Sequence, residues 1–171
     1  MNVLVWLARW RVRLGALTAV AALLLARPTW TSWRIGLVIA LLGEGIRIWA
    51  AGHLEKSREV TRSGPYRFTP HPLYVGSSVL ALGVVVAAAS PVLAVLALVY
   101  MSATITAAIR TEEAYLRAAF GSTYDDYRAS RAQPMMRTFS LARAVRNREY
   151  RAAAGVVIGF ALLALRVVWP L

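Results

Sequence analysis

The chain has 171 residues, of which 58% are hydrophobic, and its mean hydropathy is +0.54. These values are well above those of a soluble domain of this length, so the bilayer is the expected solvent. The absence of cysteine excludes a disulfide framework, a thiol nucleophile and a thiolate metal site. The formal charge of +12 suggests nucleic acid at first, but the positions of the charges give another explanation.

Five apolar segments follow one another along the chain. A transmembrane helix needs about 20 mostly apolar residues, and four segments qualify: 30–51, 73–89, 91–109 and 152–168. An earlier segment, 14–26, reaches spanning length only if its helix begins upstream, near Val3. We therefore predict an all-α polytopic membrane bundle of about five transmembrane helices, with residues 1–171 as a single integral-membrane domain.

Most of the 20 lysines and arginines lie within residues 9–13, 56–67 and 110–151. Such loops are cytoplasmic by the positive-inside rule. We therefore expect a cytoplasmic N-terminus, with segments 52–72 and 111–151 on the same cytoplasmic face of a bacterial inner membrane. Topology and attraction to anionic lipid explain the charge without a nucleic-acid partner.

A tight turn at Ser90-Pro91 is predicted to join segments 73–89 and 91–109 as an antiparallel hairpin, because proline suits the first turn of a helix. Small residues, including Gly76 and Gly83, are expected to bring the two arms of this hairpin close together.

The segment 63–76 reads S-G-P-Y-R-F-T-P-H-P-L-Y-V-G. Each proline disfavours the helical region for the residue before it, so His71 is expected to be extended, with Pro72 opening the next helix. His71 and Tyr74 then share one face, and Gly76 permits close approach of a ligand. The alternative is a membrane-interface cap in which Tyr66, His71 and Tyr74 form an aromatic belt.

A second polar segment, 111–131, begins where the fourth apolar segment leaves the bilayer. Glu112 and Glu113 are costly there unless each has a partner or a function. An i,i+4 pair with Arg117 accounts for Glu113 alone. The remainder predicts an amphipathic helix broken at Gly121, which either covers a pocket or lies on the membrane.

Two ionisable residues also occur within the segment 30–51. Glu44 and Arg47 are three residues apart, which favours a mutual ion pair over a cofactor contact.

The two polar segments together resemble the superfamily of isoprenylcysteine carboxyl methyltransferases and phospholipid methyltransferases, which are integral-membrane enzymes. The resemblance covers residues 44–134 and rests on matching order and spacing. The matching residues are Gly64-Pro65-Tyr66, His71-Pro72-Leu73-Tyr74-Val75-Gly76, Glu112-Glu113, Phe120-Gly121, Tyr124, Tyr127, Arg131 and Pro134.

The resemblance implies a methyltransferase that binds S-adenosylmethionine in a pocket facing the cytoplasm and acts on a lipid, a prenylated molecule or another lipophilic acceptor entering from the bilayer. No metal is implied. The implied catalytic residues are Glu113, Arg67 and Arg131. The implied cofactor-binding residues are Tyr66, His71, Tyr74, Gly76, Glu112 and Glu113.

One position departs from the pattern. Pro70 stands where relatives carry an arginine that the carboxyl-methylating branch uses for its substrate carboxylate, unless Arg67 replaces it in space. The identity of the acceptor, and whether O, N or S is methylated, stays open. Two alternatives remain: an NADPH-dependent membrane reductase of the sterol-reductase type, and a non-catalytic membrane scaffold.

Overall fold

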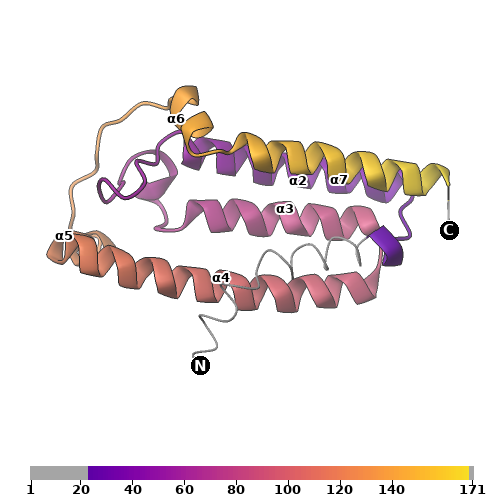
Figure 1. The fold of residues 1–171 in the computed structure, drawn as a ribbon, viewed down its shortest axis with the longest axis horizontal. Coiled ribbons are helices and arrows are strands. Elements are labelled where there is room, and N and C mark those ends of the chain that lie inside the picture. Colours follow the sequence, from indigo (N-terminus) through magenta and orange to yellow (C-terminus); the bar gives the residue numbers. More distant parts are fainter. Residues whose placement is uncertain (1–22, 170–171) are drawn as a thin grey trace.

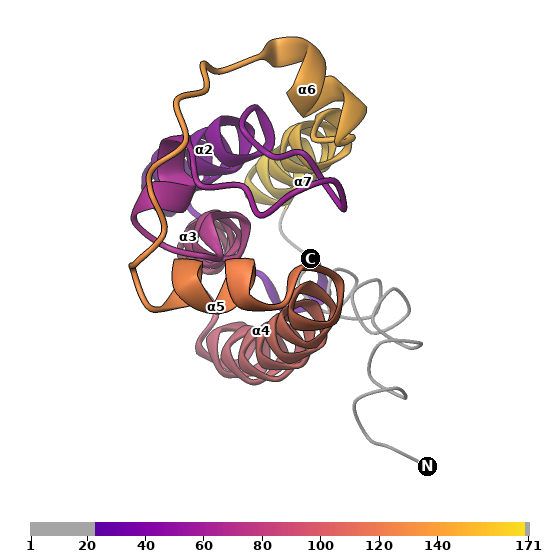
Figure 2. The same ribbon diagram turned by 90° about the vertical axis from the view of Figure 1, so that its left-hand side faces the viewer.

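The computed structural model describes residues 23–169, which are helical with connecting loops and contain no strand over that range. The long helices α2, α3, α4 and α7 run along a common direction, and the short elements gather at one end (Figures 1 and 2). The all-α prediction is confirmed for these residues. In chain order the elements are α2 (Trp30–Ala51), the 3-10 helix η1 (Gly64–Arg67), α3 (Pro72–Ala88), α4 (Pro91–Phe120), α5 (Ser122–Arg128), α6 (Leu141–Arg146) and α7 (Tyr150–Val168).

Helix α2 has the bounds that the sequence predicted. Its first turn is closed by a reciprocal capping box: the Ser32 amide donates to Thr29 Oγ1 at 3.1 Å, and the Thr29 amide donates to Ser32 Oγ at 2.9 Å. These bonds satisfy amide groups that the helix itself leaves unpaired. The helix ends where Gly52 begins the polar loop.

Glycines bring α2 and α3 into backbone contact. A Cβ atom on Gly36 would lie 2.4 Å from the carbonyl oxygen of Gly83, and one on Gly43 would lie 2.4 Å from the Leu80 amide nitrogen. Gly76 faces the same interface, 2.8 Å from the Gly43 carbonyl oxygen by the same measure. The expectation that Gly76 and Gly83 would pack against α4 was therefore wrong. The apolar pattern could not distinguish which neighbouring helix the glycines would face.

The turn between α3 and α4 matches its prediction. Ala89 adopts a left-handed conformation with φ of 49°, Pro91 occupies the first turn of α4, and Ser90 Oγ accepts from the Leu93 amide at 3.4 Å. Helix α4 continues for 30 residues, which at about 1.5 Å per residue is about 45 Å. This length exceeds a hydrocarbon core of about 30 Å. The last turns of α4, with Glu112 and Glu113, therefore extend toward the polar end of the bundle.

Within residues 23–169, two helices are long and apolar enough to cross a membrane by length and composition, α4 and α7, and α3 is a shorter apolar helix. Helix α2 forms as predicted but falls outside this group. Segment 14–26 lies mostly outside the described residues, so the five-span count and the cytoplasmic N-terminus stay predictions.

A strap of residues 132–149 fastens the loop 52–61 at the polar end of the bundle. Two nitrogens of the Arg137 guanidinium donate to the Glu59 carboxylate, at 2.6 and 2.8 Å. Arg143 and Arg146 both donate to Glu55 Oε1 at 2.9 Å. Asn147 Nδ2 donates to the carbonyl oxygens of Ala51 and Leu54, both at 2.9 Å. The loop therefore has a defined shape although it contains no regular secondary structure.

Candidate active site

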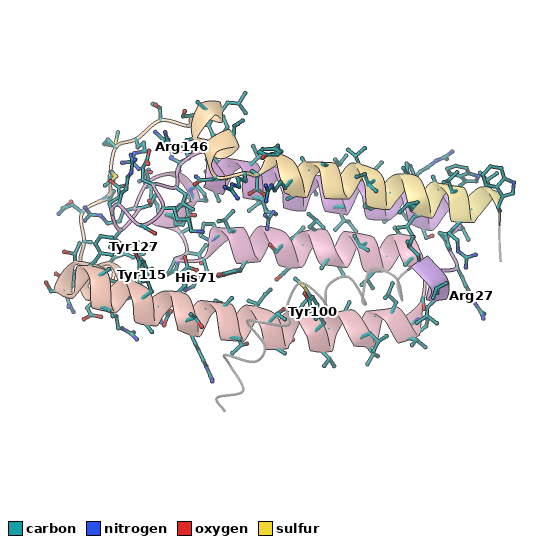
Figure 3. All side chains as sticks on the ribbon, in the orientation of Figure 1. Arg27, His71, Tyr100, Tyr115, Tyr127 and Arg146 are labelled. Atoms are coloured by element: carbon teal, nitrogen blue, oxygen red, sulfur yellow. The ribbon has the colours of Figure 1, made fainter. Side chains whose placement is uncertain are left out.

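A cavity of about 540 Å³ opens at this polar end. Its wall is formed by the loop 54–61, η1, the start of α3, the later turns of α4, α5 and residues 147–149. Figure 3 shows the labelled His71, Tyr115 and Tyr127 at the end of the molecule where α4 and α5 meet. The two polar segments that the sequence singled out, 63–76 and 111–131, therefore meet at one cavity.

His71 is held between two glutamates of α4. Its Nε2 lies 3.2 Å from Glu113 Oε1, and its Nδ1 lies 3.8 Å from Glu112 Oε2. The flanking prolines explain the position, since they keep His71 out of the helix and make it the N-cap of α3, at φ −127°. The ring of Tyr74, one turn further on, has its centre 5.8 Å from that of His71.

The two neighbouring glutamates differ in their partners. Glu113 lies 3.1 Å from Arg128 and 4.0 Å from Arg117, the second being the expected i,i+4 pair. Glu112 lines the cavity, and its side chain is 43% exposed. Within residues 23–169, His71 is its one ion-pair partner. The negative charge of Glu113 is therefore neutralised by arginine. Glu112 has no arginine partner among the described residues, and its carboxylate is available to the cavity.

Three further glutamates line the cavity, and each is paired with arginine. Glu59 binds Arg137, Glu55 binds Arg143 and Arg146, and Glu149 Oε1 accepts from Arg47 Nε at 2.7 Å. Arg143 holds the pKa of the Glu55 carboxyl below its usual range. Among the cavity glutamates of the described chain, Glu112 is therefore the one with no arginine within ion-pair distance.

Tyrosine side chains form much of the remaining wall. Tyr127 Oη donates to the Tyr66 carbonyl oxygen at 2.6 Å, which ties α5 to η1. Burial raises the pKa of both Tyr66 and Tyr127, so both phenols are neutral at physiological pH. Tyr124 is fully buried, the Arg117 guanidinium lies 5.9 Å from its ring centre, and its hydroxyl has no hydrogen-bond partner among the described residues.

A second charged cluster joins the bundle to the cavity. Arg47 Nε lies 2.7 Å from Glu149 and 3.6 Å from Glu44, and its Nη1 donates to Ser77 Oγ. The predicted Glu44–Arg47 pair is present, but the shorter contact is to Glu149, which precedes α7. A partner about 100 residues away leaves no local signal in the sequence.

Not every predicted site residue reaches the cavity. The cavity is lined by Tyr66, His71, Tyr74 and Glu112. Glu113 does not line it but contacts His71, which does. Gly76 lies against Arg47 and α2. Arg67 is exposed and outside the lining, and Arg131 pairs with Asp126 at 2.8 Å on the surface.

Sequence reasoning missed several residues of the cavity wall, notably Glu55, Glu59, Asn147 and Glu149. The loop 52–61 follows α2 directly and sits among positive charges, so its two glutamates were the available signal. These glutamates could have been expected to pair with arginine, and the strap provides those arginines.

Comparison with known proteins agrees with the resemblance found in the sequence. Searches of curated proteins and of solved structures gave no match. The model of the family described as phospholipid methyltransferase matches residues 16–123, which is well over half of the chain. This match includes both glutamates of α4 and the His71–Gly76 motif. The chain belongs to the phospholipid methyltransferase family.

Proposed function

We propose that this protein transfers a methyl group from S-adenosylmethionine to a lipophilic acceptor in the membrane. Family membership indicates a methyltransferase that acts on a membrane lipid. The observation that carries the finer proposal is the cavity: Glu112 faces it without an arginine partner in the described chain, beside an imidazole and several tyrosine rings.

The residues of the wall fit the chemistry of this cofactor. S-adenosylmethionine carries a sulfonium and an ammonium group, and both favour a carboxylate and the faces of aromatic rings. Glu112 supplies the carboxylate, and Tyr66, Tyr74 and Tyr115 supply aromatic surface. The volume of about 540 Å³ falls within the range of about 300–1,000 Å³ usual for small-molecule sites.

The cofactor's own carboxylate requires a positive partner. Lys56 is the lysine of the wall, and no arginine of the described chain lines it. Lys56 is therefore our candidate for this contact.

When bound, the cofactor supplies an electrophilic methyl group, and the protein's task is alignment and exclusion of water. Tyr66 is 7% exposed and Tyr124 is fully buried, so both rings are shielded from bulk solvent. Two predicted residues act indirectly in this proposal. Gly76 lets α3 lie against α2, and Glu113 holds His71.

The proposal also includes the membrane. The positive charge of the loops around the cavity supports a site on the cytoplasmic face of a bacterial inner membrane. The acceptor enters from the bilayer along α3 and α4, and Thr104 and Ala107 of α4 line the cavity. Arg67 and Arg131, at the surface, are candidates for contacts with the anionic headgroup of that acceptor.

A transfer assay tests this function. Purified protein is incubated with methyl-labelled S-adenosylmethionine and a total lipid extract, and the labelled product is identified. We expect label in a lipid fraction, and less of it with a Glu112→Gln variant than with an Asp125→Asn variant, which alters a surface carboxylate that is 57% exposed. Label in no fraction, or thermal stabilisation by NADPH and not by S-adenosylhomocysteine, would contradict the proposal.

A further inference from the structure

The two imidazole nitrogens of His71 differ: Nε2 forms a hydrogen bond, and Nδ1 has no hydrogen-bond partner among the described residues. Nε2 lies 3.2 Å from Glu113 Oε1, whose charge is in turn paired with Arg128 at 3.1 Å. An ionised carboxylate only accepts hydrogen bonds, so Nε2 must carry the hydrogen. In the neutral ring this leaves the lone pair on Nδ1.

The ring that carries this lone pair belongs to the cavity wall. Nδ1 is buried and has no hydrogen-bond partner among the described residues, and the side chain of His71, 10% exposed, lines the cavity. Its nearest charged neighbour is Glu112 Oε2, at 3.8 Å. An imidazolium formed here would lie between two carboxylates, Glu112 on one side and Glu113 on the other, which stabilise its charge.

We propose that His71 is the general base of the reaction and that Glu113 is the residue that positions it. This inference rests on the proposed function, because Glu112 is the carboxylate that would hold the cofactor's positive groups. Nδ1 would then stand beside the reacting atoms, where a general base must lie within hydrogen-bond reach.

The proton transfer is balanced within the site. An N–H or O–H bond of the acceptor breaks, its proton forms a bond with the lone pair of Nδ1, and the electron pair stays on the acceptor atom. That electron pair would form the new bond to the methyl carbon while the carbon–sulfur bond of the donor breaks and its electron pair goes to the sulfur. The product imidazolium returns its proton to solvent after each turnover.

The role of His71 restricts the acceptor. A carboxylate has no proton to give up at neutral pH, whereas an ammonium or hydroxyl group does. The wall agrees, because Lys56 is its one lysine and no arginine of the described chain lines it, and we assign Lys56 to the carboxylate of the cofactor. We therefore infer an acceptor whose nucleophilic atom carries a proton, in preference to a carboxylate.

Nuclear magnetic resonance tests the geometry without any substrate. The chain has 2 histidines, so a His53→Gln variant labelled with ¹⁵N-histidine, purified through a tag without histidine, reports His71 alone. We expect hydrogen on Nε2 and a bare Nδ1 at mildly alkaline pH, and loss of this preference in a variant that adds Glu113→Ala. Hydrogen on Nδ1, or equal tautomers with Glu113 intact, would overturn the inference.

Kinetics tests the chemical role. His71→Asn puts a residue favoured at N-caps at the start of α3 but removes the base, which typically contributes about 10²–10⁴-fold. We expect kcat with phosphatidylethanolamine in detergent micelles to fall at least about 100-fold, and the fall of kcat toward low pH to disappear. The Kd for S-adenosylhomocysteine should change less than about 10-fold, the value of one hydrogen bond.

The two hypotheses fail in different ways. His71→Asn could weaken S-adenosylhomocysteine binding and yet leave kcat unchanged when enough S-adenosylmethionine is added to saturate the site. His71 would then be a cofactor ligand only, and its role as a base would be overturned. Absence of methyl transfer by the unmodified protein to any lipid would instead contradict the proposed function. In that case the tautomer measurement still decides whether Glu113 positions His71.

Discussion

Replacing Gly43 by alanine tests the α2–α3 interface on which the cavity is built. The new Cβ would lie 2.4 Å from the Leu80 amide nitrogen and 2.7 Å from the Gly76 carbonyl oxygen. Both atoms are backbone, so no change of rotamer relieves the clash, and the two helices must separate. Overpacking of this kind costs about 1–3 kcal/mol.

Gly45 is the matched control, two residues away in the same helix. A Cβ atom there meets nothing within 4 Å, so Gly45→Ala should stabilise the helix by about 0.5–1 kcal/mol. Gly43→Ala has the same gain in helix propensity, but the steric clash destabilises it. The two variants should therefore differ by about 2 kcal/mol, which corresponds to roughly 6 °C in Tm for a protein of this size.

The assay is thermal unfolding of both variants in the same detergent at one scan rate, because membrane proteins often unfold irreversibly. We expect Gly45→Ala at or slightly above the wild-type Tm and Gly43→Ala below it. Equal Tm values, or a higher value for Gly43→Ala, would show that the two backbones do not approach as closely as described.

Two further predictions concern buried charge. Burial, with Arg143 and Arg137 nearby, lowers the pKa of His53 from its ordinary value of 6.5. The unfolded chain therefore takes up this proton at higher pH than the folded protein, so the stability is complete above about pH 6.5 and falls as the pH drops below it. His53→Gln should reduce the slope of Tm against pH between about pH 7 and 5, and an unchanged slope would assign that dependence elsewhere. Replacing Arg47 by methionine leaves Glu149 and Glu44 without their positive partner. The free energy of unfolding should fall by about 3–5 kcal/mol, measured by thermal unfolding. Adding Glu149→Gln should recover part of this loss, and no recovery would contradict the pairing.

Local rules predicted the helices well. Proline opens α3 and α4 as predicted, and Gly121, with φ of 50°, breaks the helix where expected. The length of α4 was underestimated, because hydropathy marks where a helix leaves the membrane and not where it ends. Helical periodicity continues through Glu112 to Phe120 after the apolar residues stop.

The site was predictable where it depends on short spacing. His71 is fixed by the prolines beside it, and the paired glutamates are conspicuous at a membrane boundary. The partners of those residues were not predictable, because they come from distant segments: Arg128 reaches Glu113 from α5, and Glu149 reaches Arg47 from the start of α7. The same limit explains why Gly76, selected as a residue near the ligand, lies instead against α2.

Calorimetric titration with S-adenosylhomocysteine tests the central claim most directly. The detergent-solubilised protein should bind it, and Glu112→Gln should weaken binding by about 10–100-fold, because a charge-assisted hydrogen bond contributes about 1.5–3 kcal/mol. Asp126→Asn, at a surface carboxylate that is 49% exposed, should bind as the wild type does. Equal affinity in the Glu112→Gln and Asp126→Asn variants would contradict the assignment of this cavity as the cofactor site.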